Sequence, residues 1–308
     1  MESSSTFLLC SAIFFSAALY LYLLARGKHK EGSQQAPPPP PGPPGWPVFG
    51  NMFDLVSMPH HTLAGLRRKY GPVLSLRLGS MNTLVIMSAT AASELFKNHD
   101  LSFAGRSINE AMRACCFNEG SMALGQYGPY WRALRRLCAT QLFVSRRLNE
   151  TTSIRKKCVD GMIEWIAAEA SKNSSVDVAH FVFLSVFNLV GNLTFSCNLL
   201  DPDSKEGAEF FRLSAVCTSL SGQPNVADFF PFLRWLDPQG IRRKMEKNLQ
   251  LLMDIAGNFV EEHIRNQSSH KDPEEKDLLD VLLEFRGVGN EEPAQISRRD
   301  VKILILGK

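Results

Sequence analysis

The pattern of hydrophobic and polar positions divides the chain into three consecutive regions, and the first is almost purely apolar. Residues 3–25 contain no charged residue and no histidine, and their apolar centre runs from Phe7 to Leu24. A helix of 23 residues extends roughly 35 Å, which is enough to cross a bilayer. We therefore expect a transmembrane anchor over residues 3–25.

Basic residues follow this apolar stretch at once, at Arg26, Lys28, His29 and Lys30. Positive charge on that side of an anchor predicts that the rest of the chain faces the cytoplasm. The alternative is a cleaved leader, which would make the protein secreted. A leader has a basic region before a shorter apolar core, whereas the only early charge here is Glu2. The pattern favours the retained anchor.

The second region, residues 26–50, joins this basic stop to a proline-rich hinge. Residues 37–47 read Pro-Pro-Pro-Pro-Pro-Gly-Pro-Pro-Gly-Trp-Pro. Such a run excludes helix and central strand and predicts an extended polyproline segment. It is either a semi-rigid spacer or a ligand for proline-binding domains. Its position directly after an anchor favours the spacer.

The third region, residues 51–308, has the periodicities of a folded body. Its first part predicts a short helix over 63–70 and a strand over 73–79, in which leucines alternate with other residues. A turn at 80–82, a second strand over 84–87 and a helix over 89–98 follow. We expect a small β-sheet here.

From Tyr130 onward the apolar spacing is helical almost throughout. Helices are predicted over about 129–142, 145–171, 178–198, 206–221, 239–266 and 275–286. A last helix opens at Ser297 with Asp300 three residues on, as in a capping box, and its apolar run is typical of the start of a buried helix. The sequence therefore predicts a mainly α fold with a small β-sheet.

Composition excludes several classes of protein. With 34 basic and 31 acidic residues, the net charge of +3 is too small for a nucleic-acid binder. The seven cysteines are scattered and form no CxxC pair, which argues against a zinc site. We interpret them as buried free thiols in a reducing compartment.

The stretch from Gln126 to Arg136 carries the clearest candidate chemistry. Trp131 and Arg135 are four residues apart and share one face of a predicted helix. An indole N–H and a guanidinium fork together suit a carboxylate. The alternative is an amphipathic helix with a buried tryptophan and a solvated arginine.

The order of the motifs resembles the plant microsomal cytochrome P-450 family of haem-thiolate monooxygenases. The motifs are the anchor, the hinge ending Pro-Pro-Gly-Trp-Pro-Val-Phe-Gly-Asn, Tyr-Gly-Pro-Val-Leu-Ser-Leu-Arg-Leu-Gly at 70–79, Phe-Ala-Gly-Arg at 103–106, and Tyr-Gly-Pro-Tyr-Trp-Arg-Ala-Leu-Arg-Arg at 127–136. The resemblance implies that Trp131 and Arg135 bind the propionates of haem. It also implies a place in the endoplasmic reticulum membrane and electrons from an NADPH-dependent flavin reductase.

Residues 222–240 resemble the geraniol 8-hydroxylase and iridoid oxidase group, with flavonoid hydroxylases as close relatives. The resemblance implies a small apolar, terpenoid-like substrate and oxygen insertion into it. The family's first substrate-contacting region corresponds to the segment between Arg106 and Leu124. Its soft apolar side chains suit such a ligand, and the alternative is a mobile loop. The candidate pocket residues are Met112, Cys115, Phe117 and Met122.

The family's cysteine loop, Phe-x-x-Gly-x-Arg-x-Cys-x-Gly, matches no segment of the chain. The resemblance implies that the acidic-Thr step of the long central helix and the structural Glu-x-x-Arg pair that follows it in the family are also missing. Residues 51–308 are therefore expected to be an incomplete domain that ends at the start of that helix, with no catalytic residue and no metal ligand. The chain by itself is predicted to be inactive. The alternative is a non-catalytic membrane-anchored fragment that pairs or competes with a full-length relative.

A series of basic residues extends along two predicted helices. It is either a docking surface for an acidic reductase or a solvated face. The series consists of Arg132, Arg136, Arg146, Arg147, Arg155, Lys156 and Lys157.

Overall fold

The computed structural model describes residues 14–16, 20, 38–55, 58–141, 149, 151–172, 175–195, 198–200, 205–267, 278–287 and 292–307. The expected anchor over 3–25 lies outside the described residues apart from 14–16 and 20, so it stays a prediction. Within the described ranges, no helix is both long and apolar enough to span a membrane. The chain divides into two units, Met1–Phe103 with Phe229–Pro231, and Ala104–Asp228 with Phe232–Lys308.

The first unit is built on an antiparallel hairpin. Its elements are η1 (Met52–Leu55), α2 (Pro59–Tyr70), β1 (Val73–Leu78), β2 (Met81–Ile86), α3 (Ala89–Asn98) and α4 (Asp100–Phe103). Leu74 and Leu76 are buried, which confirms the leucine face expected for the first strand. The turn predicted at 80–82 is wrong, because Leu78 already pairs with Met81. Gly79 has a φ of +59° and lets the chain reverse within two residues.

The described end of the proline-rich hinge lies along the edge of β1. The Ser75 amide donates to the carbonyl of Pro41 at 3.0 Å, and a Cβ at Gly42 would overlap the carbonyl oxygen of Ser75. Further along, the Asn51 amide donates to the Arg77 carbonyl at 2.6 Å. Glycine at position 42 therefore permits the close approach, and this part of the hinge is attached to the sheet.

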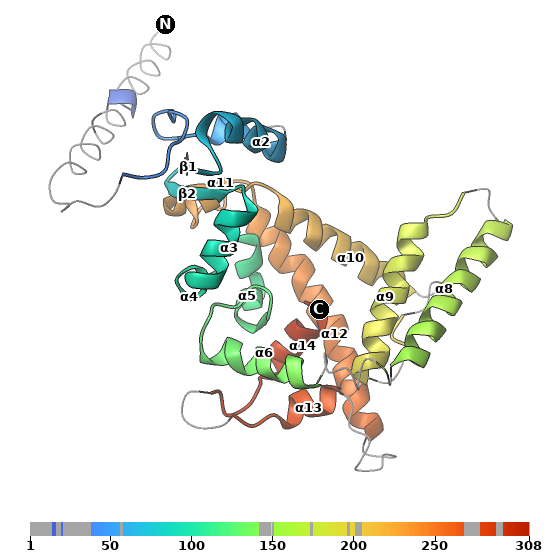
Figure 1. The fold of residues 1–308 in the computed structure, drawn as a ribbon. Helices are drawn as coiled ribbons and strands as arrows, with labels where there is room; N and C mark the ends of the chain where they lie inside the picture. Colours follow the sequence, from blue (N-terminus) through green and yellow to red (C-terminus); the bar gives the residue numbers. More distant parts are fainter. Residues whose placement is uncertain are drawn as a thin grey trace, which may run out of the picture. The chain divides into compact units, whose positions relative to one another are not determined.

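The second unit is helical (Figure 1). Its elements are η2 (Ala111–Cys116), α5 (Phe117–Gly120), α6 (Pro129–Gln141), α8 (Thr152–Lys172), α9 (Val178–Phe195), α10 (Lys205–Gly222), α11 (Val226–Phe229), η3 (Pro231–Leu233), α12 (Ile241–Gln267), α13 (Leu278–Glu284) and α14 (Arg298–Leu306). The mainly α fold with a small sheet is confirmed. Most of the long helices match their predicted ranges closely, but the helix predicted over 145–171 is found as α8, which begins only at Thr152 after a turn at Thr151. The short elements η2 and α5 were not expected, because elements of four to six residues are too short to show a helical period.

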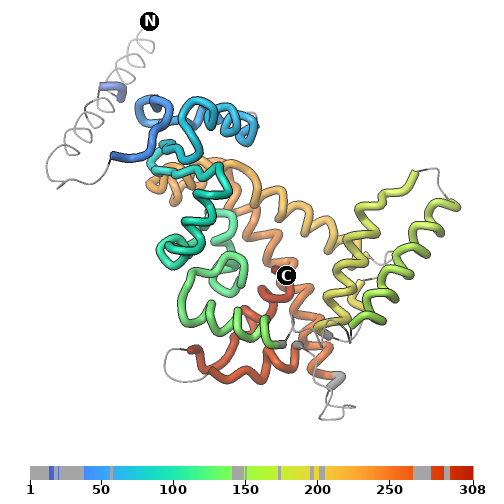
Figure 2. The backbone as a smooth tube through the Cα atoms, in the orientation of Figure 1, coloured from blue at the N-terminus to red at the C-terminus, as the bar shows by residue number. Residues whose placement is uncertain are grey.

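Helix α12 contacts α10, η2 and α14, and α8 packs along α9 (Figure 2). One buried cluster joins α9, α10, α12 and α14 through residues such as Leu184, Phe210 and Met245. The start of α14 is capped as expected, since the Asp300 amide donates to the Ser297 hydroxyl at 3.1 Å. The Asp300 carboxylate accepts from Tyr130 instead of returning to the cap, so only half of the capping box forms.

Candidate functional site: an apolar cavity between helices

A cavity of about 410 Å³ lies inside the second unit. Its walls come from the η2–α5 segment, α9, α10, α12 and α14. A volume of this size is within the range of about 300–1,000 Å³ that is typical of small-molecule sites.

One wall of the cavity is aromatic. The rings of Phe187 and Phe210 have centroids 4.2 Å apart, and the Phe183 ring stacks on Phe187 at 6.4 Å with an interplanar angle of 6°. Phe183 and Phe187 are four residues apart on α9, so they lie on one helix face. Such rings offer a large apolar surface with little conformational freedom, which suits a hydrocarbon ligand.

The wall from α12 is aliphatic, with Met245, Leu249 and Leu252 at the spacing of one helix face. From α14, Ile305 and Leu306 reach the cavity, followed by Gly307. Apolar walls of this kind exclude water and bind by burial of apolar surface.

Two of the four pocket residues predicted from the sequence line the cavity, and two do not. Met112 and Phe117 are in its wall. Cys115 instead places its Sγ 3.7 Å from the carbonyl oxygen of Glu246 on α12, and Met122 packs against the core cluster around Val260 and Ile305. Burial raises the pKa of the Cys115 thiol, so this cysteine is a neutral packing group.

The cavity-lining residues of α9, α10 and α12 were not predicted from the sequence, although their apolar i, i+4 and i+7 spacing is visible there. That spacing predicts a buried face but does not distinguish a packed core from a cavity wall.

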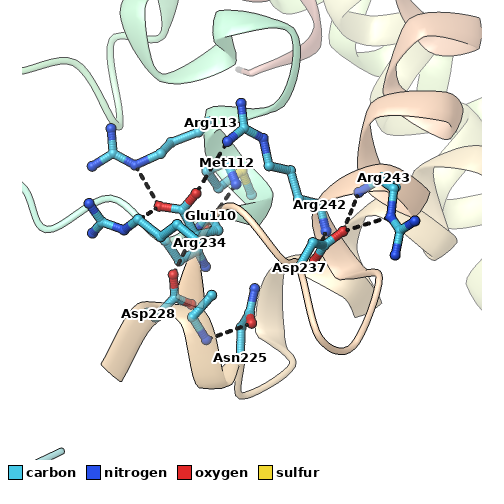
Figure 3. A network of polar contacts seen from close by, with 11 residues as sticks. Glu110, Met112, Arg113, Asn225, Asp228, Arg234, Asp237, Arg242 and Arg243 are labelled. Carbon is cyan, nitrogen blue, oxygen red and sulfur yellow. Dashed lines mark hydrogen bonds and ion pairs between the residues drawn. The ribbon is translucent and has the colours of Figure 1, made fainter. Parts of the chain in front are cut away.

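A buried carboxylate fixes the start of η2, the element that carries Met112. The Glu110 side chain is 2% exposed and lies between three guanidinium groups (Figure 3). Arg113 Nε is 3.1 Å and Arg234 Nε 3.0 Å from Oε1, and Arg242 Nη1 is 3.5 Å from Oε2. Oε1 accepts no well-aligned hydrogen bond from a described residue, so the attraction is mainly coulombic. The network ties η2 to the start of α12.

A second carboxylate beside this network belongs to Asp228. Its Oδ1 accepts from the Glu110 amide at 2.6 Å. Burial raises the pKa of the Asp228 carboxyl, and the negative charge of Glu110 raises it further. Asp237 serves a different purpose, because it accepts from the Arg242 and Arg243 amides and so caps α12.

Trp131 and Arg135 lie on α6, and neither is in the cavity wall. The indole N–H of Trp131 donates to the carbonyl of Met122 at 2.9 Å. Arg135 is exposed and makes no hydrogen bond or ion pair with any other described residue. The arginine therefore presents a free guanidinium, whereas the single donor of the tryptophan is already engaged.

Hydrogen bonds between polar side chains link α6 to α14. The Tyr130 hydroxyl donates to Asp300 Oδ2 at 2.8 Å, and Arg299 Nε donates to Asp300 Oδ1 at 2.9 Å. Burial and the bond to Asp300 raise the pKa of Tyr130 well above its usual value. These hydrogen bonds hold α14, and with it Ile305, against the rest of the unit.

The predicted basic series is only partly available as a surface. Arg136 donates both Nη atoms to Glu292 at 2.7 and 2.9 Å, which neutralises it. Arg132 is exposed over the Tyr127 ring, with 5.7 Å to the centroid. Arg146 and Arg147 lie outside the described residues. Reductase docking at this series stays a prediction.

Comparison with known proteins relates the geometry to a family. A family model described as Cytochrome P-450 matches residues 40–307. The chain is 44% identical over 300 residues to iridoid oxidase of Catharanthus roseus, covering 96% of this chain and 58% of that protein. It is 44% identical over 310 residues to Cytochrome P-450 76A2 of Solanum melongena, covering 99% and 60%. Drimenol monooxygenase of Persicaria hydropiper is 35% identical over 251 residues, covering 82% and 50%.

A solved structure supports the same fold. Zebra fish cytochrome P-450, in a structure with progesterone, superposes with a TM-score of 0.63 at 19% identity, covering 80% of this chain and 54% of that one. The chain thus spans about three fifths of the length of the first two relatives.

The family and the fold imply haem as cofactor. Arg135 suits a haem propionate, but Trp131 as it lies does not, because its indole N–H donates to Met122. The pair does not fit the group in this arrangement, and a propionate contact from Trp131 requires that bond to break.

Proposed function

Because this chain belongs to the cytochrome P-450 family, we propose that it supplies the substrate-binding part of a haem-dependent monooxygenase that hydroxylates a small apolar plant metabolite of the terpenoid type. The observation that carries the proposal is the apolar cavity walled by α9, α10, α12 and α14. Relatives named iridoid oxidase and drimenol monooxygenase support the substrate class.

In this proposal the residues of the chain bind and orient the substrate. The phenylalanines of α9 and α10 and the aliphatic face of α12 take up its hydrocarbon part and exclude water. The Glu110 network holds η2 so that Met112 and Phe117 close one side.

The oxygen step needs groups that these 308 residues do not contain. A cysteine thiolate on the iron is required for O–O cleavage in this family, and no segment matches the cysteine loop. We infer that the chain by itself does not insert oxygen. Electrons would come from an NADPH-dependent flavin reductase, and an anchor over 3–25 would hold the protein in the endoplasmic reticulum membrane with its body facing the cytoplasm.

The proposal is tested by expressing the chain with a haem supply and measuring two properties of the purified membranes or detergent extract. We expect saturable binding of a small apolar terpene and no thiolate-type absorbance band in the reduced carbon-monoxide spectrum. A thiolate-type band would overturn the inferred inactivity, and absence of terpene binding would overturn the assignment of the cavity. Co-purification with a full-length relative would instead favour the non-catalytic alternative.

A further inference from the structure

The ion-pair network around Glu110 directs two guanidinium groups outward. Arg113 Nε and Arg234 Nε lie 3.1 and 3.0 Å from the same oxygen, Oε1 of Glu110. Because the two groups share one partner atom, they are neighbours, although their residues are far apart in the chain. Figure 3 shows both on one side of Glu110, with their Nη ends directed away from the carboxylate. Each arginine therefore uses its Nε inside the network and presents its Nη groups on the outside.

The buried carboxylate holds these two side chains in place. The Glu110 side chain is 2% exposed, whereas those of Arg113 and Arg234 are 40 and 42% exposed. The Glu110 backbone is fixed in turn, because its amide donates to Asp228 Oδ1 at 2.6 Å. A long side chain loses conformational freedom when it binds a ligand. Here the ion pairs already restrict both arginines, so a ligand at their Nη ends meets donors that are positioned in advance.

The positive charge of the network is not fully compensated. Its three guanidinium groups, on Arg113, Arg234 and Arg242, face only the two carboxylates of Glu110 and Asp228, which leaves a net charge of +1. Within the described ranges, Arg113 and Arg234 form no ion pair except with Glu110. An anion between their Nη ends would be attracted by this charge and would reduce the repulsion between the two guanidinium groups.

A phosphate group suits two guanidinium groups better than a carboxylate does. A carboxylate has two oxygens, which a single guanidinium can match with two parallel hydrogen bonds. A phosphate monoester has three terminal oxygens and a charge of about −1.5 to −2 at neutral pH. It can therefore accept hydrogen bonds from two guanidinium groups at once.

We propose that Arg113 and Arg234 form a binding site for a phosphate group on the outer side of the Glu110 network. Neither arginine lines the apolar cavity, so the site is separate from it and the inference does not depend on the proposed function. The same chemistry would bind inorganic phosphate or the monoester headgroup of a lipid.

Calorimetric titration of the full chain with sodium phosphate, at neutral pH and constant ionic strength, tests the site. We expect saturable binding, with acetate binding about tenfold more weakly or less. Arg113→Lys and Arg234→Lys keep a positive charge beside Glu110 but replace the planar fork by a single ammonium. Each should weaken phosphate binding about tenfold, as expected for one charge-assisted hydrogen bond. The control Arg212→Gln, from a surface pair with Glu209 on α10, should bind phosphate like the wild type.

Two soluble short-chain lipids distinguish the sources of the phosphate group. Dihexanoyl phosphatidic acid presents a phosphate monoester, whereas dihexanoyl phosphatidylcholine has the same acyl chains and a diester with a compensating ammonium. Tighter binding of the phosphatidic acid than of inorganic phosphate and of the phosphatidylcholine, weakened in both lysine variants, would identify a lipid headgroup. Equal affinities for phosphatidic acid and inorganic phosphate would identify a site for the phosphate group alone.

A second measurement separates phosphate binding from the stability of the network. A ligand that binds the folded chain raises the midpoint of urea unfolding by mass action. Phosphate should therefore raise the midpoint of the wild type more than that of either lysine variant, whatever their midpoints are without phosphate. Absence of saturable phosphate binding in the wild type, or wild-type affinity in both lysine variants, would overturn the site. Equal affinities for acetate and phosphate would overturn its assignment to phosphate.

Discussion

Removal of the charge on Glu110 is expected to weaken the helical unit measurably. The side chain is 2% exposed, and the three guanidinium groups around it, on Arg113, Arg234 and Arg242, lie 3.0–3.5 Å from its oxygens. In Glu110→Gln the shape is preserved, but three positive charges are left facing one another without their anion.

The size of the expected loss in free energy of unfolding depends on the burial of the carboxylate and on the partial exposure of its arginine partners. Breaking a fully buried ion pair costs about 3–5 kcal/mol. The arginine side chains here are 40, 42 and 44% exposed, so water solvates them in part when the carboxylate is lost. We therefore expect Glu110→Gln to lower the free energy of unfolding by about 2 kcal/mol, or the midpoint of thermal unfolding by about 4–8 °C.

Urea unfolding monitored by circular dichroism measures the change, with an unaltered slope as evidence that the folded state keeps its compactness. The matched control is Glu209→Gln, which breaks a bidentate pair with Arg212 on the surface of α10 at 2.7 and 2.8 Å. That pair is solvated, so the midpoint should stay unchanged. If Glu110→Gln unfolds at the wild-type midpoint, the Glu110 network does not stabilise the unit.

Three further predictions concern backbone strain, close packing and pH. Gly120→Ala places a Cβ 2.7 Å from Asp300 Oδ1 and should lower the free energy of unfolding by about 1–3 kcal/mol. Gly161→Ala, in the open middle of α8, should raise it by about 0.5–1 kcal/mol in the same urea assay. Equal effects of the two substitutions would contradict the close packing at Gly120. Cys116 is exposed with a φ of +55°, so Cys116→Asn should raise the thermal midpoint by relieving about 1 kcal/mol of strain, and a lowered midpoint would count against that strain. Burial raises the pKa of Asp228 in the folded state, so folding takes up a proton and the contribution of Asp228 to stability is lost as the pH rises through its folded pKa. Asp228→Asn should therefore flatten the decline in stability from about pH 4 toward neutrality, and a pH profile identical to that of the wild type would contradict the assignment.

Long helices of the second unit were predictable because their apolar faces repeat over many turns. The helix predicted over 178–198 is found as α9, Val178–Phe195, and the one predicted over 239–266 as α12, Ile241–Gln267. Ser297 was correctly identified as the cap of α14, since a side-chain acceptor before an apolar run is a local signal.

The features that could not be predicted from the sequence are those that depend on contacts between residues far apart in the chain. The attachment of Pro41 to β1 depends on a glycine at position 42 that fits against the Ser75 carbonyl, which no local pattern indicates. Likewise, no local pattern in the sequence marks Glu110 as the centre of a buried ion-pair network. Its partners, Arg234 and Arg242, are more than a hundred residues away.

Only part of the candidate site followed from the sequence. Met112 and Phe117 were predicted as pocket residues and line the cavity. Cys115 and Met122 do not, because Cys115 faces α12 and Met122 the second core cluster. A loop of soft apolar residues predicts that its side chains are buried, but the packing around it decides which of them reach a cavity.

Titration of menthane into the chain and into two variants of α9 tests whether the cavity between α9, α10, α12 and α14 binds small apolar molecules. Val186 lines the cavity and is 56% exposed, so tryptophan in its place can fill the space without disturbing the core. Val182, on the same helix and 41% exposed, lies outside the cavity wall. We predict that Val186→Trp weakens menthane binding by about tenfold or more, while Val182→Trp binds it like the wild type. Equal affinities in all three proteins would show that menthane does not bind in this cavity.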